Sequence, residues 1–538
     1  MKKMIVTYKM LKVIACLLVC LCAACIQNDL PYPTVKLYIT KMVVEGQVGN
    51  ATISNDERKV TLELGETVNP KKVKVQTLEL TEGGTASIGP DSIIDLSKPL
   101  TVTLSLYQDY VWTIGATQTI ARAFTVTGQV GQAYFYPETH EASVNIPREK
   151  GLKNIEVTDL KLGPEGATQN GVEGVPTLQW ENKGGFATTK VQVKYSDFID
   201  EEWTLFVNLS DVNVGVNSVD AWTNVAWING FGRDGEDNGC EYKKEGDSDW
   251  IRVDASEITH SGGNFKARII HLQSNTTYVC RAYSGEEYGA EMTFTTGDVL
   301  TVPNMSFDEW HQEGKVICPW KEGDSSWWDT GNWGSTTLSA KDNITQPTSD
   351  VWSGASAGSQ AAILGSKFVG LGSIGKFAAG NLFLGEYKAT DGTNGILGFG
   401  REFSARPTKL KGHFKYTVST INYTDEAHKA LMGKADTCIV WVALGDWSEP
   451  VEIRTNPKNS KYFDKNDPNI IAYGEMNCAE TVSAYKDFEI KLDYRSTSRV
   501  PKYLLIVCSA SKYGDYFTGG AGSTMWVDDF SLEYDYDE

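Results

Sequence analysis

The stretch EGQVGNATI at residues 45–53 recurs as TGQVGQAYF at residues 127–135. A second stretch, VKVQTLELTEGGTAS at 73–87, recurs at the same spacing as IEVTDLKLGPEGATQ at 155–169. In both copies apolar and polar residues alternate between turns marked by glycine, which is the pattern of short β-strands that bury one face. An internal repeat of this length predicts one folding unit per copy, so the chain begins with two related all-β units.

A tryptophan pair extends the repeat. Trp112 ends the segment YVW in the first copy, and Trp203 ends EEW in the second, which carries extra residues before it. We expect an immunoglobulin-like β-sandwich at 35–120 and another at 121–208. The simplest role for such a pair is that of a spacer.

Composition extends the all-β prediction to the whole chain. Of 538 residues, 51 are glycine, 41% are hydrophobic and 11% are aromatic, a mixture that favours sheet sandwiches over helices. The length allows several buried cores. The formal net charge of −19 makes nucleic acids and anionic membrane surfaces unsuitable partners.

The N-terminus has the features of an export signal. Four lysines precede an apolar segment that is too short to span a bilayer and ends in small residues, so we expect a signal peptide at 1–24. The ending Cys22-Ala23-Ala24-Cys25 resembles the bacterial lipobox, which implies lipidation of Cys25, a tether at 25–34 and an outer-membrane lipoprotein on either face of that membrane. Because the lipobox usually has leucine where Cys22 stands, plain secretion and an uncleaved N-terminal anchor remain alternatives.

The cysteines and histidines do not form a recognisable metal motif. No CxxC pair occurs beyond the signal, and the six histidines are scattered, so we expect no Cys/His metal site. Cys240 and Cys280 fall on strands expected to be neighbours, and either a disulfide or two buried free thiols fits them.

Residues 209–298 have a different pattern. Trp222 lies on an early strand, Trp250 ends a hairpin strand, and LQSNTTYVCRAYSG places Tyr278 before a last hairpin. This arrangement resembles a fibronectin type III domain, in which such a tyrosine forms the tyrosine corner.

Residues 299–538 form one block with related ends. SFDEW at 306–310 opens it and MWVDD at 525–529 nearly closes it, as in jelly rolls whose first and last strands lie close together. Carboxylates from both ends suit a calcium ion, and the candidate ligands are Asp308, Asp528 and Asp529, with backbone oxygens near Asn304. Strict alternation would put Trp526, Asp528, Phe530 and Leu532 on one face, so that Asp528 points inward and needs a partner. A buried, hydrogen-bonded aspartate without a metal is the alternative.

An ordered set of motifs in this block resembles the putative carbohydrate metabolism domain found at the C-terminus of Bacteroidetes lipoproteins. The motifs are SFDEW, SSWWDTGNWG, GSQAAILGS, GKFAAGNLFLGEY, LGFGREFSARPTKLKGHFKY, TCIVWVALGDW, IAYGEM and SASKYGDYFTGGAGSTMWVDD. The resemblance implies a jelly roll with a sugar-binding pocket behind immunoglobulin-like modules. It also implies glycan handling at the cell envelope, in company with other glycan-uptake proteins, and it supplies no established reaction.

Sugar-binding sites combine aromatic platforms for the C–H faces of a ring with a few fixed polar groups for its hydroxyls. Motif membership and this chemistry select the candidates Trp328, Asp329, Asn332, Trp333, Arg401, Asp446, Trp447, Tyr473, Glu475, Lys512, Asp515 and Tyr516. Core packing is the alternative for each tryptophan, a structural ion pair for Arg401, and turn formation for the glycine-rich segment around Asp515.

Three functions fit these candidates. The first is glycan binding without catalysis, which we favour because no motif of a known nucleophile, metalloprotease or nucleotide site is present. The second is a glycoside hydrolase or polysaccharide lyase that uses two of the acids Asp329, Asp446, Glu475 and Asp515, since hydrolysis needs a carboxylate pair. The third is a structural or adhesive surface protein.

Overall fold

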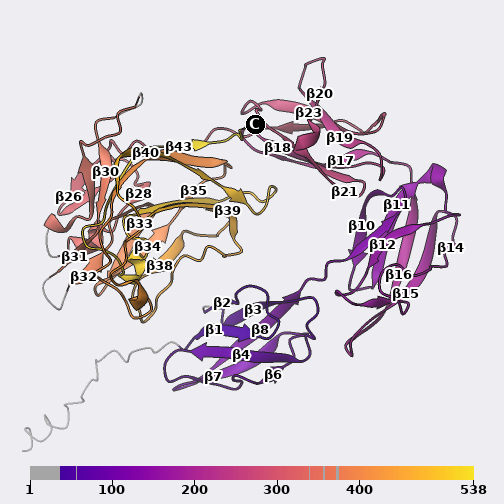
Figure 1. Ribbon diagram of the computed structural model, residues 1–538, viewed down its shortest axis with the longest axis horizontal. Helices are drawn as coiled ribbons and strands as arrows, with labels where there is room; N and C mark the ends of the chain where they lie inside the picture. Colours follow the sequence, from indigo (N-terminus) through magenta and orange to yellow (C-terminus); the bar gives the residue numbers. More distant parts are fainter. Residues whose placement is uncertain (1–36, 56, 338–339, 355–357, 371–374, 538) are drawn as a thin grey trace, which may run out of the picture. The chain divides into compact units, whose positions relative to one another are not determined.

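The computed structural model describes residues 37–55, 57–337, 340–354, 358–370 and 375–537, and its regular structure is almost entirely β-strand (Figure 1). The fold is therefore all-β. Contacts divide the chain into two units, one formed by the chain up to Phe124 with 159–178 and 190–203, the other by the remainder. Within the described residues, no helix has both the length and the apolar character that a membrane crossing requires. The expected signal peptide and Cys25 lie outside these residues.

The first copy of the repeat forms two sheets around the buried Trp112. One sheet has the order β1 (Ile39–Val44), β4 (Val73–Leu80) and β6 (Ile93–Ile94). The other has the order β2 (Thr52–Ser54), β3 (Lys59–Leu64), β8 (Asp109–Gln118), β7 (Leu100–Ser105) and β5 (Thr85–Ala86). The turn after β1 is closed by Gln47, whose side chain accepts from the Val44 amide and donates to the Gly49 carbonyl.

The second copy of the repeat builds the same turn. Gln129 accepts from the Val126 amide at 3.1 Å and donates to the Gly131 carbonyl at 2.9 Å, so the motif GQVG forms the same hydrogen bonds in both copies. The strands between 123 and 210 are β9 (Ala123–Val126), β10 (Val130–Tyr136), β11 (Glu141–Pro147), β12 (Val157–Lys161), β13 (Thr168–Gln169), β14 (Glu181–Asn182), β15 (Phe186–Tyr195) and β16 (Ile199–Ser210), with the 3₁₀ turn η1 (Arg148–Lys150). β11 runs parallel to β16 from Glu141 and Thr204 onward, as β3 runs parallel to β8.

Residues 215–295 form two further sheets. The first has the order β17 (Gly215–Ala221), β18 (Ala226–Phe231), β22 (Asn264–Ile269) and β21 (Ile258–Ser261), and the second contains β20 (Ile251–Arg252), β19 (Asn238–Lys244), β23 (Thr277–Ser284), β24 (Glu287–Tyr288) and β25 (Met292–Thr295); η2 (Ala255–Glu257) is a 3₁₀ turn. The Tyr278 hydroxyl accepts from the Gln273 amide at 2.9 Å, which is the bond expected of a tyrosine corner. Cys240 and Cys280 are free thiols, because β19 and β23 pair Cys240 with Ala282 and not with Cys280.

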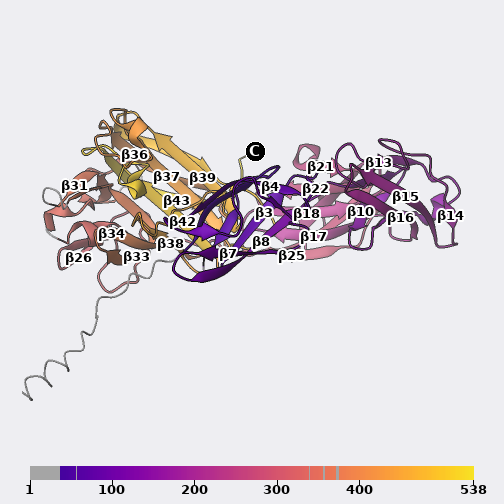
Figure 2. The same ribbon diagram turned by 90° about the horizontal axis from the view of Figure 1, so that it is seen from below.

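The C-terminal domain is a sandwich of a large and a small sheet (Figure 2). The large sheet has the order β38 (Val451–Arg454), β34 (Asn394–Phe399), β33 (Asn381–Asp391), β42 (Tyr503–Ser509), β37 (Cys438–Gly445), β39 (Ile470–Cys478) and β41 (Asp493–Tyr494), with β28 (Trp328–Asp329) and β35 (Arg401–Glu402) paired to it. The small sheet has the order β29 (Thr345–Thr348), β30 (Ala361–Gly365), β43 (Thr524–Glu533), β36 (Lys409–Thr417) and β40 (Val482–Lys491). Apolar residues of both sheets share one core, among them Val440, Leu410 and Phe530.

Short elements complete this domain. They are the hairpins β26 (His311–Glu313) with β27 (Val316–Cys318) and β31 (Lys367–Val369) with β32 (Lys376–Ala378), the helix α2 (Asn332–Ser335), and the 3₁₀ turns η3 (Ala340–Asp342), η5 (Lys429–Leu431) and η6 (Gly514–Tyr516).

The two ends of the C-terminal domain meet, as the motifs at 306–310 and 525–529 predict. The Phe530 amide donates to the Met305 carbonyl at 2.8 Å, and the rings of Phe307 and Phe530 are 5.0 Å apart. The expected alternation along the last strand is wrong, because a β-bulge at Asp529, whose φ is +48°, inserts one extra residue. Phe530 and Leu532 therefore share the core face with Met525 and Val527, while Trp526 and Asp528 lie on the other face.

Candidate functional site

The large sheet is apolar on both faces. Along β37 the side chains of Val440 and Val442 enter the core between the sheets, whereas those of Ile439 and Trp441 belong to a second apolar cluster on the opposite face. All eight residues of this strand are buried. Since successive side chains of a strand point to opposite faces, one run of apolar sequence supplies both the core and the wall of a cavity.

A cavity of about 480 Å³ lies on this second face. The floor of the cavity is formed by strands β33, β34, β37, β39 and β42. Its rim is formed by four segments, which are α2, β32, residues 455–465 and η6 with their neighbouring residues. Its volume falls within the range of small-molecule sites. The rim segments are far apart in sequence, so the cavity exists only in the folded domain.

Aromatic rings form one wall of the cavity. Trp441 stacks on Phe463 with ring centroids 4.2 Å apart and an interplanar angle of 20°, and Phe463 stacks in turn on Tyr473 at 6.2 Å. Tyr462 contacts Tyr516 of η6 at 4.2 Å. These rings offer flat apolar surfaces with phenolic hydroxyls at their edges, which is the chemistry that sugar C–H faces and hydroxyls require.

Glu475 brings an ionised carboxylate to this wall. Its side chain accepts from the Tyr473 hydroxyl at 2.5 Å and from Asn477 Nδ2 at 3.1 Å. Burial acts to raise the pKa of Glu475, but these two hydrogen bonds and the nearby Lys465 and Lys512 outweigh it and hold the pKa below its usual value. The group is therefore a fixed hydrogen-bond acceptor at neutral pH.

Asp515 lies on η6 and lines the same cavity, and its pKa is shifted in the opposite direction. Burial raises the pKa of its carboxyl to about 6, so the protonated, donating form becomes the major one below about pH 6. Across the cavity, Lys376 donates to Asn394 Oδ1 at 2.7 Å and lies over the ring of Phe517 at 4.3 Å. Burial lowers the pKa of Lys376.

The structure brings five of the twelve predicted sugar-binding residues together in this cavity: Tyr473, Glu475, Lys512, Asp515 and Tyr516. All five come from the IAYGEM and SASKYGDYF motifs. The other seven lie outside the cavity lining, and most of them have buried structural partners.

Four of these seven come from the motif SSWWDTGNWG. Trp328 is fully buried in the core, 5.1 Å from the ring of Phe307, and is thereby excluded as a platform. Asp329 accepts from the amides of Thr330 and Tyr387 and from Trp333 Nε1. Burial raises the pKa of Asp329 to about 6 despite these bonds. Trp333 thus supports Asp329 instead of facing the cavity.

The fourth, Asn332, holds buried backbone segments together through its side chain. Its Nδ2 donates to the carbonyls of Ile317 at 2.8 Å and Thr345 at 2.6 Å, and its Oδ1 accepts from the amides of Ile344 and Thr345. All of its hydrogen-bonding capacity is used, and its side chain is fully buried. No group of Asn332 remains to bind a ligand.

Arg401, Asp446 and Trp447 also have structural partners. Arg401 donates to the carbonyls of Trp327 and Gly385, and burial lowers its pKa. Asp446 pairs with Arg499 at 2.6 Å. Trp447 is buried and donates to Asp467 Oδ2 at 2.9 Å. Trp447 thus has the core role expected as its alternative, Arg401 is held by backbone carbonyls where an ion pair was the expected alternative, and Asp446 forms a structural ion pair.

The predicted calcium ligands lie near the joined ends of the domain. Asp308 Oδ1 accepts from the amides of Ser359 and Gln360, and Asp528 Oδ2 accepts from the Trp352 amide at 2.8 Å, so Asp528 has the partner that its burial demands. Burial, together with the charges of Asp529 and Asp308, raises the pKa of Asp528 to about 6. The Asn304 side chain binds the backbone of Glu309 and Pro319.

Sequence reasoning missed the main aromatic wall. Trp441 stands in the apolar run CIVWVALG and looks like core, and Phe463 and Tyr462 stand in a polar loop. The alternation of side chains along a strand was the available signal, since it places Trp441 on the opposite face of the sheet from Val440 and Val442. Nothing local indicates that the loop folds onto the sheet.

The family comparison concerns this same domain. Residues 305–533 match the family model of the putative carbohydrate metabolism domain (PCMD). The match covers the cavity and all of its candidate residues, and it indicates a carbohydrate-related role. No curated protein matches the chain.

Two solved structures resemble the chain distantly. One is described as a putative glycoside hydrolase from Bacteroides thetaiotaomicron, with 15% identity over 94% of this chain and 99% of that chain and a TM-score of 0.31. The other is described as a putative glycoside hydrolase from Bacteroides vulgatus, with 22% identity over 43% of this chain and 96% of that chain and a TM-score of 0.33.

Proposed function

We propose that the chain binds a glycan in the cavity of its C-terminal domain. The observation that carries this proposal is the wall formed by Trp441, Phe463 and Tyr473 beside the fixed carboxylate of Glu475. A sugar ring stacks its C–H face on the aromatic surface, and its hydroxyls donate to Glu475 and accept from Lys512. A purely structural or adhesive role gives no reason for such a cavity.

Catalysis is the second candidate, and one observation favours it. Asp515 and Glu475 line the same cavity, and their surroundings move their pKa values in opposite directions. A carboxyl whose raised pKa lets it donate a proton and a carboxylate that stays ionised are the two roles of a glycoside hydrolase. In that mechanism Asp515 protonates the leaving oxygen and Glu475 acts as the base or nucleophile.

A glycan array probed with the full chain tests binding. Replacing Phe463, which is partly exposed, by alanine removes the middle ring of the stack and should weaken binding by about 1–3 kcal/mol, or roughly fivefold to 150-fold. Trp526→Ala is the matched control, because Trp526 lies on the small sheet, away from the cavity. If both variants bound as the unaltered chain does, the cavity would not be the binding site.

The bound glycans then separate the two candidates. Incubation followed by product analysis should leave them intact if the chain only binds. If they are cleaved, Asp515→Asn and Glu475→Gln should each abolish cleavage, while Asp446→Asn, at an acid outside the cavity, should not. Cleavage that survives both cavity substitutions would rule out this carboxylate pair.

We also propose that a calcium ion joins the ends of the domain at Asp308, Asp528 and Asp529. Burial, and after it the neighbouring carboxylates of Asp529 and Asp308, raises the pKa of Asp528, and carboxylate and carbonyl oxygens are the ligands that Ca²⁺ prefers. Removing calcium with a chelator should then lower the melting temperature, and Asp529→Asn should reduce that difference. Equal melting temperatures with and without chelator would exclude the ion.

The sequence alone supports the remaining proposals. A lipid on Cys25 would anchor the chain to the outer membrane, where it would act with other glycan-uptake proteins of the envelope. Labelling with a radioactive fatty acid tests this, since Cys25→Ser should abolish the label.

A further inference from the structure

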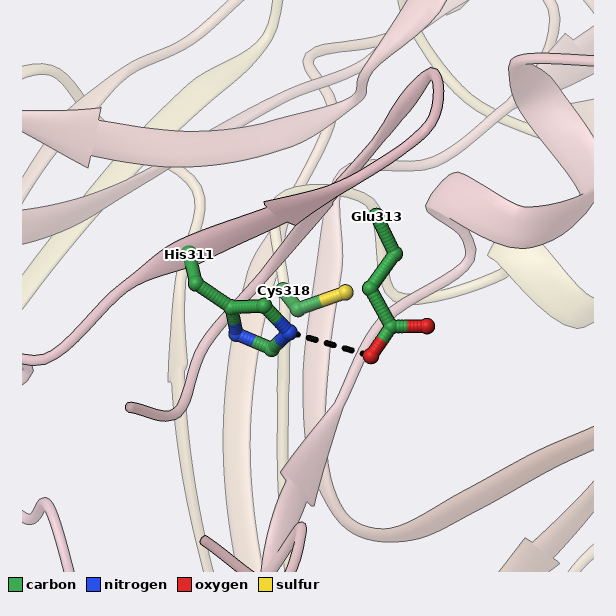
Figure 3. A group of neighbouring side chains, drawn as sticks. All are labelled: His311, Glu313 and Cys318. Carbon is green, nitrogen blue, oxygen red and sulfur yellow. Dashed lines mark hydrogen bonds and ion pairs between the residues drawn. The ribbon is translucent and has the colours of Figure 1, made fainter. Parts of the chain in front are cut away.

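The hairpin of β26 and β27 gathers three different metal-binding side chains on one face (Figure 3). His311 and Glu313 are two residues apart on β26 and therefore point to the same side, and Cys318 on β27 is the cross-strand partner of His311. One nitrogen of His311, one carboxylate oxygen of Glu313 and the Cys318 Sγ lie within 4.8 Å of one another. The cluster lies outside the cavity lining.

The imidazole of His311 is held in the orientation of a metal ligand. Its Nδ1 lies 2.7 Å from the Trp320 carbonyl, which only accepts, so Nδ1 carries a proton. Its Nε2 lies 3.0 Å from Glu313 Oε1. If the imidazole is neutral and Nδ1 carries the proton, the lone pair of Nε2 faces the Glu313 carboxylate, which is unfavourable. A proton or a metal ion between Nε2 and the carboxylate removes this repulsion. Histidine ligands of metals usually donate their second N–H to a carbonyl in this way.

Burial raises the pKa of the Cys318 thiol, so a metal ion must displace the thiol proton, but nearby carboxylates favour a cation. The carboxylate of Glu322 acts electrostatically on His311, and that of Asp329 acts on Cys318. Cys318 is fully buried beneath the cluster, whereas Glu313 is half exposed, so the group opens to solvent on the side of the carboxylate. An ion can enter there without unfolding the hairpin.

We propose that His311, Glu313 and Cys318 bind a zinc ion. Nitrogen, sulfur and oxygen ligands together suit Zn²⁺, whereas Ca²⁺ and Mg²⁺ prefer oxygen alone. Tetrahedral zinc places its ligand atoms about 3.5 Å apart, so the ligand atoms that lie farther apart than this must move together when the ion binds. Three protein ligands leave the fourth position to water or to an incoming group.

The ion would stiffen a segment that supports the cavity. The Ile317 carbonyl, next to Cys318 on β27, accepts from Asn332 of α2, and the neighbouring Gly331, Gly334 and Ser335 line the cavity. Zinc binding is nevertheless independent of the glycan proposal, and either can fail without the other.

Titration of the full chain with Zn²⁺, after treatment with a chelator, tests the inference. We expect one zinc per chain and a melting temperature higher by about 5–10 °C when free zinc exceeds the dissociation constant a hundredfold. Cobalt in place of zinc should give a thiolate-to-metal charge-transfer band, which reports the sulfur ligand directly.

Three substitutions and two controls complete the test. His311→Ala, Cys318→Ala and Glu313→Gln should each weaken zinc binding more than about tenfold, and the last changes an exposed side chain without disturbing the fold. Gln312→Ala on the opposite face of β26 and Cys478→Ala elsewhere in the domain should bind zinc normally. An absence of zinc binding in the folded chain, or binding that survives Glu313→Gln and His311→Ala, would leave only a His311–Glu313 ion pair and overturn the inference.

Discussion

Replacing Asn332 by alanine should destabilise the C-terminal domain strongly and leave the cavity chemistry intact. Sequence reasoning places Asn332 among the sugar ligands, whereas in the structure its amide holds two carbonyls and two amides of buried backbone. The substitution leaves all four backbone groups without this partner. Each unsatisfied buried group costs about 1–3 kcal/mol, and water that enters the space recovers part of this, so we expect a loss of about 3–6 kcal/mol.

The measurement is differential scanning calorimetry of the full chain. A domain of this size loses about 2–4 °C of melting temperature per kcal/mol, so the transition of the C-terminal domain should fall by roughly 6–24 °C. Asn466→Ala, at an exposed position, should change stability by less than about 0.5 kcal/mol. An Asn332→Ala variant that melts normally but no longer binds glycan would refute this reasoning and return Asn332 to the binding site.

Three further predictions concern the same domain. The pKa of Asp515, about 6, is above its ordinary value of 3.8, so the folded state binds more protons than the unfolded state between about pH 4 and 6. The contribution of Asp515 to stability should therefore fall as pH rises through this window, and Asp515→Asn should flatten the dependence of melting temperature on pH there. Tyr473→Phe removes the hydroxyl that donates to Glu475 and should raise the Glu475 pKa, which a carboxyl NMR titration would detect. Gly385→Ala should prevent stable folding, as judged by circular dichroism, because φ is +143° and a Cβ would lie 2.1 Å from the Gly398 carbonyl oxygen.

Much of the fold could be predicted from the sequence, because its determinants are local. Alternation between glycine-marked turns indicates strands, and the repeated GQVG motif forms the same turn in both copies. The bulge at Asp529 was not predictable in this way, because one extra residue reverses the alternation without leaving a mark in composition.

The candidate site could be predicted only in part. Glu475 and Asp515 were found because their motifs combine acids with aromatic residues, and both line the cavity. Trp328 was a false candidate and Trp441 a missed one, since a tryptophan in a buried strand and one in a cavity wall have the same local pattern and differ only in what covers them.

The proposed zinc ligands also could not be recognised from local sequence patterns. A search for CxxC pairs passes over His311, Glu313 and Cys318, because a hairpin brings them together through register and not through a fixed motif. The three residues are recognisable as a candidate metal site only when the cross-strand pairing of His311 with Cys318 is known.

The two apolar faces of the large sheet have an evolutionary consequence. Along β37, changes at Ile439 and Trp441 alter what the cavity accepts, while changes at Val440 and Val442 alter the packing that keeps the domain folded. Under the proposed binding function, ligand preference and stability are thus encoded on alternate positions of the same strand. Related proteins can change their ligands by replacing the cavity-facing residues, while the core-facing residues remain constrained by the stability of the domain.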